Sequence, residues 1–181
     1  MQNIGDRIEV KNGKEKIEIS IYPKISAKDQ LILNVWLIAW SICGVAVISQ
    51  LFIDSYTSQE KLFMSIYLVF WAYLEFKVLH AFRWNRWGKE LIVLNQGRLN
   101  YTKAIGKRGL PIDFELSQIA GFQYVSEVEK GIWNDINRSV WMVGGEVIQF
   151  VVDGKVRRIG MKLSAKEGER LARLLNKYVK Q

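Results

Sequence analysis

Three ionisable residues in an otherwise apolar segment are the first candidates for chemistry. Glu75, Lys77 and His80 interrupt the end of the run LFMSIYLVFWAYLEFKVLHAF at 62–82. A charge inside hydrocarbon costs on the order of 2.5–3.5 kcal/mol, so such residues usually pair with protein groups or lie at an interface. Proton or ion translocation is disfavoured, because two spans with one acid and one histidine make a poor relay, and two interpretations stay open. Either the three residues mark the inner membrane interface, or Glu75 pairs with a polar group of the first helix or of a partner span.

Catalytic and metal-binding patterns do not accompany these residues. His80 is the only histidine and Cys43 the only cysteine in the 181 residues, so neither a His/Cys metal site nor a nucleophile paired with histidine is expected. The chain also contains no P-loop, HExxH or GxSxG pattern. We therefore expect no enzyme activity, no cofactor and no metal, and we assign no catalytic residue.

Glu75 lies in the second of two long apolar runs. The first, 31–53, holds 23 uncharged residues. As a helix it would be about 35 Å long, enough to cross a hydrocarbon core of about 30 Å. The second, 62–82, follows after a linker, 54–61, that is too short for a folded module. The pattern predicts a transmembrane hairpin with an external loop.

Basic residues around the two runs predict the orientation of the hairpin. Six Lys or Arg residues precede the first run, whereas the loop 54–61 has only Lys61. By the positive-inside rule both termini are expected in the cytoplasm. Arg83, Trp84, Arg86 and Trp87 directly follow the second run, and such cationic and indole side chains favour the headgroup depth. They are therefore expected at the membrane interface together with Lys77 and His80.

The segment 83–181 is predicted to be one cytoplasmic β domain. Short runs rich in β-branched and aromatic residues end at turn signals, of which Asp153-Gly154 is the strongest. Ser164 and Glu167 have the spacing of a capping box, and an amphipathic helix follows them. Seven runs have the pattern of strands: 89–94, 98–103, 110–116, 121–128, 138–143, 146–152 and 155–160.

The residues before the first apolar run form an arm, 1–30, with its own pattern. Two alternating segments flank Asn12-Gly13, which predicts a β-hairpin over 7–21 that lies along the sheet of the main domain. The expected fold class is thus a membrane protein of the α+β type. It combines a two-helix transmembrane hairpin with a pleckstrin-homology (PH)-like β-barrel or sandwich of about seven strands and a C-terminal helix.

Several short motifs resemble a bacterial family of unknown function with two spans and a PH-like domain. They are KIEISIYPK at 16–24, Trp71 and Glu75 in the second run, WGKELI at 87–92, and the segments 154–160 and 163–167. The resemblance implies a fold and a membrane setting. The expected location is therefore the bacterial inner membrane.

A second, weaker similarity points to the photosystem I assembly factors, which also place two spans before a β-rich domain. Trp84-Asn85 and the segment EVEKGI at 127–132, which precedes Arg138, look like parts of that family. The segment 88–90 and the short external loop differ from its pattern.

Charge narrows the choice of partner. After Phe82 the chain holds 18 Lys and Arg against 10 Asp and Glu, which gives this segment the whole formal net charge of +8. A basic domain beneath an anionic leaflet gains roughly 1 kcal/mol for each suitably placed basic residue. Because no nucleic-acid-binding motif is present, membrane lipids are the expected partner of this charge, and nucleic acid is not.

The segment EVEKGIWNDINRSVW at 127–141 interrupts the strand pattern. Its Trp133, Arg138 and Trp141 are candidates for partner binding, together with Glu75, because tryptophan and arginine supply binding anchors. The alternative is that Trp133 and Trp141 cover the core of the domain itself. The leading interpretation is a non-enzymatic scaffold or assembly subunit of an inner-membrane complex, which can itself be a homo-oligomer. The alternative is a lipid-sensing or membrane-surface-binding PH-like module, and photosystem assembly is a lesser one.

Overall fold

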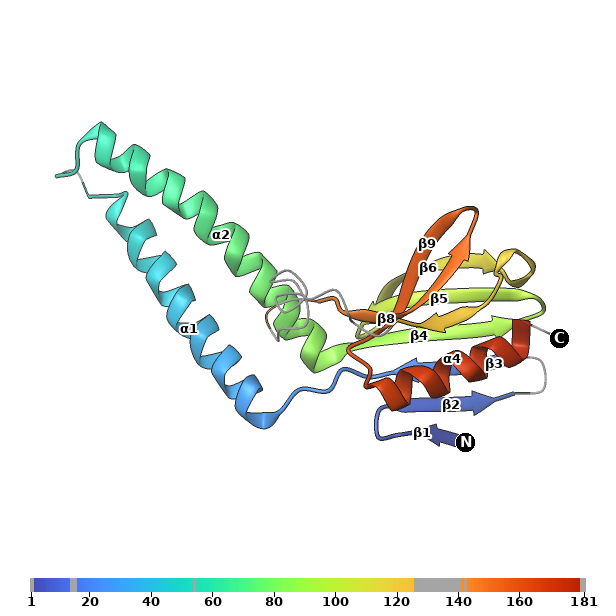
Figure 1. Ribbon diagram of the computed structural model, residues 1–181. Coiled ribbons are helices and arrows are strands. Elements are labelled where there is room, and N and C mark those ends of the chain that lie inside the picture. Colours follow the sequence, from blue (N-terminus) through green and yellow to red (C-terminus); the bar gives the residue numbers. More distant parts are fainter. Residues whose placement is uncertain (1, 14–15, 54, 126–140, 142, 180–181) are drawn as a thin grey trace.

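Two parts of different shape make up the computed structural model, a pair of long helices and a β domain (Figure 1). The structure describes residues 2–13, 16–53, 55–125, 141 and 143–179. The element order is β1–β3, then α1 and α2, then β4–β9 and finally α4. The described ends of the chain both lie in the β domain, at the same end of the helical pair.

The helical pair consists of α1 (Ala27–Gln50) and α2 (Ser58–Trp87). Ser26 caps α1, because its side chain accepts a hydrogen bond from the Asp29 N–H at 3.1 Å. Thr57 and Glu60 form a capping box at the start of α2. The last residue of α2 is followed at once by β4, so no flexible linker separates the helix from the sheet.

The larger sheet contains six antiparallel strands in the order β1-β2-β3-β4-β5-β6. Its strands are β1 (Gln2–Ile4), β2 (Ile8–Asn12), β3 (Lys16–Ile21), β4 (Gly88–Asn95), β5 (Arg98–Ile105) and β6 (Arg108–Glu115). The arm pairs with the main domain through β3 and β4, with Ile19 opposite Ile92. The predicted hairpin over 7–21 is therefore confirmed, and the two helices are inserted between neighbouring strands of one sheet.

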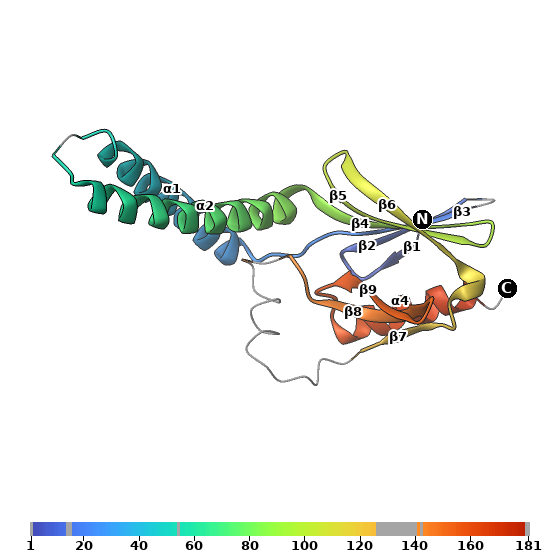
Figure 2. The same ribbon diagram turned by 90° about the horizontal axis from the view of Figure 1, so that it is seen from above.

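The smaller sheet forms a second layer with the order β7-β8-β9 (Figure 2). Its strands are β7 (Phe122–Tyr124), β8 (Glu146–Val152) and β9 (Lys155–Met161), and the short 3₁₀ helix η1 (Leu116–Gln118) leads into it. Helix α4 (Ala165–Val179) packs on β7. Asn176 joins the two, because its side chain accepts from the Phe122 N–H and donates to the Phe122 carbonyl, both at 2.7 Å.

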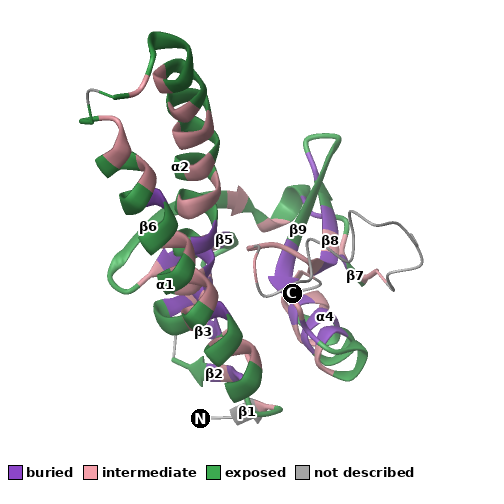
Figure 3. Ribbon diagram, turned by 90° about the vertical axis from the view of Figure 1, so that its left-hand side faces the viewer, coloured by how far each residue is buried: buried purple, intermediate pink, exposed green. Residues whose placement is uncertain are grey.

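The core lies between the two layers, and Figure 3 shows how few residues of the helices are buried by comparison. Its members alternate along the strands, as Ile92 and Leu94 do on β4, while Leu171 and Leu175 come from one face of α4. The predicted capping box before α4 is confirmed, with Glu167 accepting from the Ser164 N–H at 2.9 Å.

Of the two predicted alternatives, a barrel or a sandwich, the described residues form no closed barrel but two separate antiparallel sheets. The chain leaves the large sheet after β6 through η1, and the arm widens that sheet on its other side, so β6 and β9 stay at sheet edges. The predicted strands 89–94, 98–103, 110–116, 146–152 and 155–160 correspond to β4, β5, β6, β8 and β9. The predicted strand 121–128 is shorter as β7, and most of 138–143 lies outside the described residues.

Candidate functional site

A polar contact joins the two helices halfway along their length. The Ser41 hydroxyl lies 2.7 Å from Oε1 of Glu75 and 2.8 Å from the Leu37 carbonyl oxygen. One hydroxyl hydrogen can serve only one of these acceptors at a time. The other carboxyl oxygen of Glu75, Oε2, is buried and has no hydrogen-bond partner among the described residues. Glu75 thus faces α1, and only one of its two carboxyl oxygens has a hydrogen-bond partner among the described residues.

Close packing of two aromatic residues surrounds this contact. Trp71 Nε1 donates to the Trp40 carbonyl oxygen at 2.9 Å. A Cβ atom at Gly44 would lie 2.0 Å from the Trp71 ring, so only glycine permits this approach. Trp40 stacks on Trp36 with ring centroids 5.2 Å apart, and its own Nε1 is buried without a partner among the described residues.

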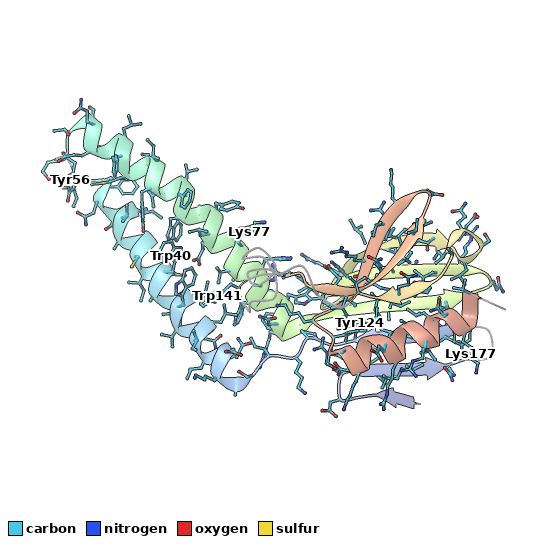
Figure 4. The ribbon with its side chains drawn as sticks, viewed as in Figure 1. Trp40, Tyr56, Lys77, Tyr124, Trp141 and Lys177 are labelled. Carbon is cyan, nitrogen blue, oxygen red and sulfur yellow. The ribbon has the colours of Figure 1, made fainter. Side chains whose placement is uncertain are left out.

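The interface residues expected at the end of the second run are divided between the surface and the interior. Lys77, His80, Arg83 and Arg86 are exposed, and the Lys77 ammonium lies 5.6 Å from the Tyr73 ring (Figure 4). Trp87 is also exposed and packs edge-to-face on Phe82. Trp84, in contrast, is buried where α2 meets the β domain, because the helix continues directly into β4.

Of the three candidates in the segment 127–141, the structure describes only the last, Trp141. Trp133 and Arg138 lie outside the described residues. Trp141 is half-buried and contacts Trp36 of α1 edge-to-face, with ring centroids 5.1 Å apart (Figure 4). Trp141 therefore touches the first half of α1, and it is not a member of the domain core.

A buried charge cluster connects the arm, β4 and the end of β9. Glu90 is 1% exposed, and its carboxyl group accepts from the Tyr101 hydroxyl and the Gly160 N–H at 2.8 Å and from the Met161 N–H at 2.5 Å. Gly160 has a φ of 79°, a conformation that favours glycine and that turns its N–H towards Glu90. Arg7 donates to the Met161 carbonyl at 2.6 Å and to that of Lys162 at 3.1 Å.

Burial controls the titration of this cluster. Desolvation raises the pKa of Glu90, and the hydrogen bonds from Met161, Gly160 and Tyr101 oppose that change only in part. Desolvation and the nearby Glu90 carboxylate raise the pKa of Tyr101. Desolvation lowers the pKa of Arg7, against the attraction of Glu167 and Glu90. A cavity of about 220 Å³ adjoins the cluster and is lined by Arg7, Trp84 and Glu90, among others.

The sequence interpretation did not single out Arg7, Glu90 or Tyr101. One signal was available for Glu90, because on a strand it shares a face with Ile92 and Leu94, and these three are buried together. An acid on the apolar face of a strand indicates a buried partner. Arg7 gave no such signal, since it lies 83 positions from Glu90 in the chain.

Together these observations define a class of protein, an α+β protein with two long apolar helices inserted into a two-layer β domain. Among the described residues no three His, Cys, Asp or Glu side chains lie close enough to hold a metal ion. No family model matches the chain, and no curated protein matches it.

Proposed function

We propose that this protein is a membrane-anchored, non-enzymatic accessory or assembly subunit of a bacterial inner-membrane complex. Its hairpin spans the membrane, with both termini and a PH-like β domain on the cytoplasmic side. Support for the membrane setting comes from the surface of the helices. Only 11% of the most apolar window of α1 and 6% of that of α2 are buried, whereas a core helix of a soluble protein would be mostly buried.

The depth of Glu75 supports a role inside the bilayer. Helix α2 has 30 residues and is therefore about 45 Å long, more than a bilayer core requires. Glu75 precedes the end of α2 by 12 residues, or about 18 Å. Lys77, His80, Arg83 and Arg86 occupy the turns between Glu75 and the β domain, where cationic side chains can reach the headgroups. Among the acidic, basic and histidine residues of α2, Glu75 lies nearest the middle of the helix.

The observation that carries the proposal is the partly satisfied polar contact at Glu75. An ionisable residue inside a span is costly and is usually retained for a function. Here Ser41 serves one carboxyl oxygen, while Oε2 of Glu75 and Nε1 of Trp40 have no partner among the described residues. Because both atoms are buried in this structure, a span of another protein would supply a donor to Oε2 and an acceptor to Nε1 only when the two side chains turn towards it. A two-helix hairpin with such a contact is suited to binding another integral membrane protein.

Co-purification from membranes tests the proposal. The full chain and its Glu75→Gln variant are extracted in mild detergent, and the co-purifying proteins are identified and quantified. We expect one stoichiometric set of membrane proteins with the wild type and a loss of at least severalfold with Glu75→Gln, at equal membrane insertion. Ser65→Ala is the matched control, because Ser65 is an exposed polar residue of the same helix that bonds only to the Lys61 carbonyl.

Other outcomes would change the proposal in defined ways. Equal recovery of partners with Glu75→Gln and wild type would show that Glu75 is only an interface marker. Recovery of photosystem subunits would favour photosystem assembly. Purification of the wild type without any partner, from membranes in which it is fully inserted, would contradict the role as a subunit.

A further inference from the structure

A groove lies between the core-facing side of the large sheet, at β5 and β6, and the β8–β9 hairpin. It has a volume of about 580 Å³ and is lined on one side by residues of β5 and β6, and on the other by residues of β8 and β9. Tyr101 and Phe150 line it as buried aromatic residues. The groove is distinct from the contact at Glu75, which lies in the helices.

The rim of the groove presents apolar side chains to the surroundings. Leu110 is 87% exposed, Ile112 51% and Val156 57%. Leu110 and Ile112 are two positions apart on β6 and so project from the same face of the strand. Exposed apolar residues that gather at a groove indicate an interaction site for an apolar partner.

Cationic side chains accompany these apolar residues. Arg157 and Arg158 lie on β9, are exposed and line the groove. Neither forms an ion pair with any residue in the described part of the chain, whereas Lys103, on β5, pairs with Glu146. Arginine favours phosphate because its planar guanidinium can donate two parallel hydrogen bonds. The groove therefore suits a ligand that carries both an anionic group and apolar chains.

The two sheet edges beside the groove disfavour a peptide as the occupant. A peptide would add as a strand to the free edge of β6 or β9. Pro111 in β6 lacks an N–H, and β9 begins with Lys155 and carries Arg157 and Arg158 along its exposed half. Proline and cationic residues on an edge strand are devices that prevent strand addition. These edge residues thus disfavour a peptide. The apolar and cationic side chains of the groove suit a partner that is not a peptide.

The position of the groove relative to the helices points to the membrane. The turn between β5 and β6 is anchored at the end of α2, where the Gly106 N–H donates to the Trp87 carbonyl at 2.8 Å. Lys107 and Arg108 follow in that turn and on β6, and both are exposed. In Figure 1 the β8–β9 hairpin and β6 lie on the side of the domain towards which α1 and α2 rise, while α4 and β1 lie on the opposite side.

We propose that this groove binds anionic phospholipid of the leaflet in which the hairpin is anchored. Arg157, on the same face of β9 as the buried Ile159, holds the phosphate, Arg158 adds positive charge at the rim, and Leu110, Ile112 and Val156 contact the apolar region beneath the headgroups. The β domain is then held against the membrane surface and does not extend freely into the cytoplasm. This inference rests on the proposed membrane insertion, but it is independent of the role as a subunit of a complex.

Spin labels on the full chain in lipid vesicles test the inference. In a Cys43→Ala background, one label is placed at Leu110→Cys in the groove and, in a separate sample, one at Ile66→Cys on the exposed face of α2. Vesicles contain phosphatidylcholine alone or a 7:3 mixture with phosphatidylglycerol, with the ratio chosen as roughly that of an anionic leaflet. Collision with a water-soluble nickel chelate is measured for each label.

We expect anionic lipid to lower the chelate accessibility of the label at 110 by about fivefold or more, since each basic residue near the surface contributes roughly 1 kcal/mol. The double variant Arg157→Glu/Arg158→Glu should restore the accessibility found in phosphatidylcholine. Lys166→Glu/Arg170→Glu is the matched control, because it changes the net charge equally on exposed positions of α4. It should leave the protection at 110 intact.

The label at 66 separates the two proposals. Protection at 66 in both vesicles, with equal accessibility at 110 in both, would overturn the lipid inference alone. Accessibility at both positions would overturn the membrane insertion itself. Equal loss of protection with the α4 control would also overturn the inference, because net charge and not the groove would then attract the lipid. Protection at 110 that needs a co-purified protein and not anionic lipid would assign the groove to a protein partner.

Discussion

The helical pair and the β domain have opposite arrangements of apolar residues. On α1 and α2 the large apolar side chains point outwards, as Ile38 and Phe70 do, and Gly44 and Leu33 are the buried residues of α1. In the β domain the apolar side chains point inwards, as Ile19 and Leu171 do. The same kinds of residue are thus sorted in two ways within one chain. The difference is what the proposed membrane insertion requires, with lipid around the helices and water around the β domain.

The contacts that hold each part together differ in the same way. The helices meet through one close glycine contact and two side-chain hydrogen bonds, from Ser41 and Trp71. The β domain combines an apolar core with the buried cluster around Glu90. Loss of one contact should therefore affect the two parts to different extents.

The largest expected effect comes from Glu90→Ala. The substitution leaves Arg7 without its nearby buried carboxylate, and it leaves the Gly160 and Met161 N–H groups without their acceptor. Removal of one partner from a buried charged cluster costs about 3–5 kcal/mol. Thermal unfolding of the full chain in detergent, followed by near-ultraviolet circular dichroism, should show this loss. The far-ultraviolet helical signal of α1 and α2 should persist after the β domain unfolds, and joint unfolding would contradict the separation of the two parts.

A matched pair of leucines sharpens the comparison. Leu171 is fully buried in the β domain, whereas Leu62 on α2 is 62% exposed. Leu171→Ala should lower the free energy of unfolding of the β domain by about 2–5 kcal/mol through the cavity it leaves. Leu62→Ala should change the stability of the purified protein by less than about 0.5 kcal/mol, as for exposed sites. Similar losses from the two variants would show that α2 is buried as the β core is.

Gly44→Ala tests the contact between the helices. The added methyl group meets the Trp71 ring, so the tryptophan must move and its hydrogen bond to the Trp40 carbonyl breaks. Overpacking of this kind costs about 1–3 kcal/mol, although alanine itself favours a helix. Distances between spin labels on α1 and α2 should increase, and the melting of the β domain should not change. Cys43→Ala, at the exposed neighbouring position, is the control and should leave the distances unchanged.

The smallest effect is a change in pH dependence. Burial raises the pKa of Glu90. A carboxyl group with a higher pKa in the folded chain stabilises it fully below the unfolded pKa of about 4.3, and this stabilisation is lost as pH rises through the folded pKa. The melting temperature of the wild type should therefore exceed that of Glu90→Gln by more at pH 4 than at pH 7. A gap that widens with pH would mean that Arg7 and the three donors hold the carboxylate in its charged form.

The strands and helices were predictable where a local pattern repeats. The alternation in 89–94 and 146–152, the Asp153-Gly154 turn and the capping box at Ser164 each depend on neighbouring residues, and each is confirmed. The 7–21 hairpin was predictable for the same reason. Its docking on the sheet of the main domain was expected because an isolated hairpin is marginal in water, whereas its partner strand, β4, was not predicted.

The closure of the sheets and the buried cluster were not predictable in the same way. Whether the short strands form a barrel depends on how β6 connects to β7. The chain makes this connection through η1, and no repeating sequence pattern predicts it. Trp84 had the local sequence of an interface residue, but the direct passage of α2 into β4 buries it. Arg7 meets Glu90 and Met161 only after the arm has paired, and such contacts between distant residues leave no local pattern.

The insertion of α1 and α2 between β3 and β4 also sets an order of events during synthesis. The 66 residues from 22 to 87 separate two hydrogen-bonded neighbours of one sheet. At about 5–20 residues per second, the ribosome needs roughly 3–13 s to make that stretch. Until β4 emerges, Ile8, Val10 and Ile19 of the arm lack the strand that pairs with β3, and under the proposed membrane insertion the helices enter the bilayer in the same interval. We expect a chaperone to protect the arm during that wait, and site-specific crosslinking from position 19 on stalled nascent chains would identify it.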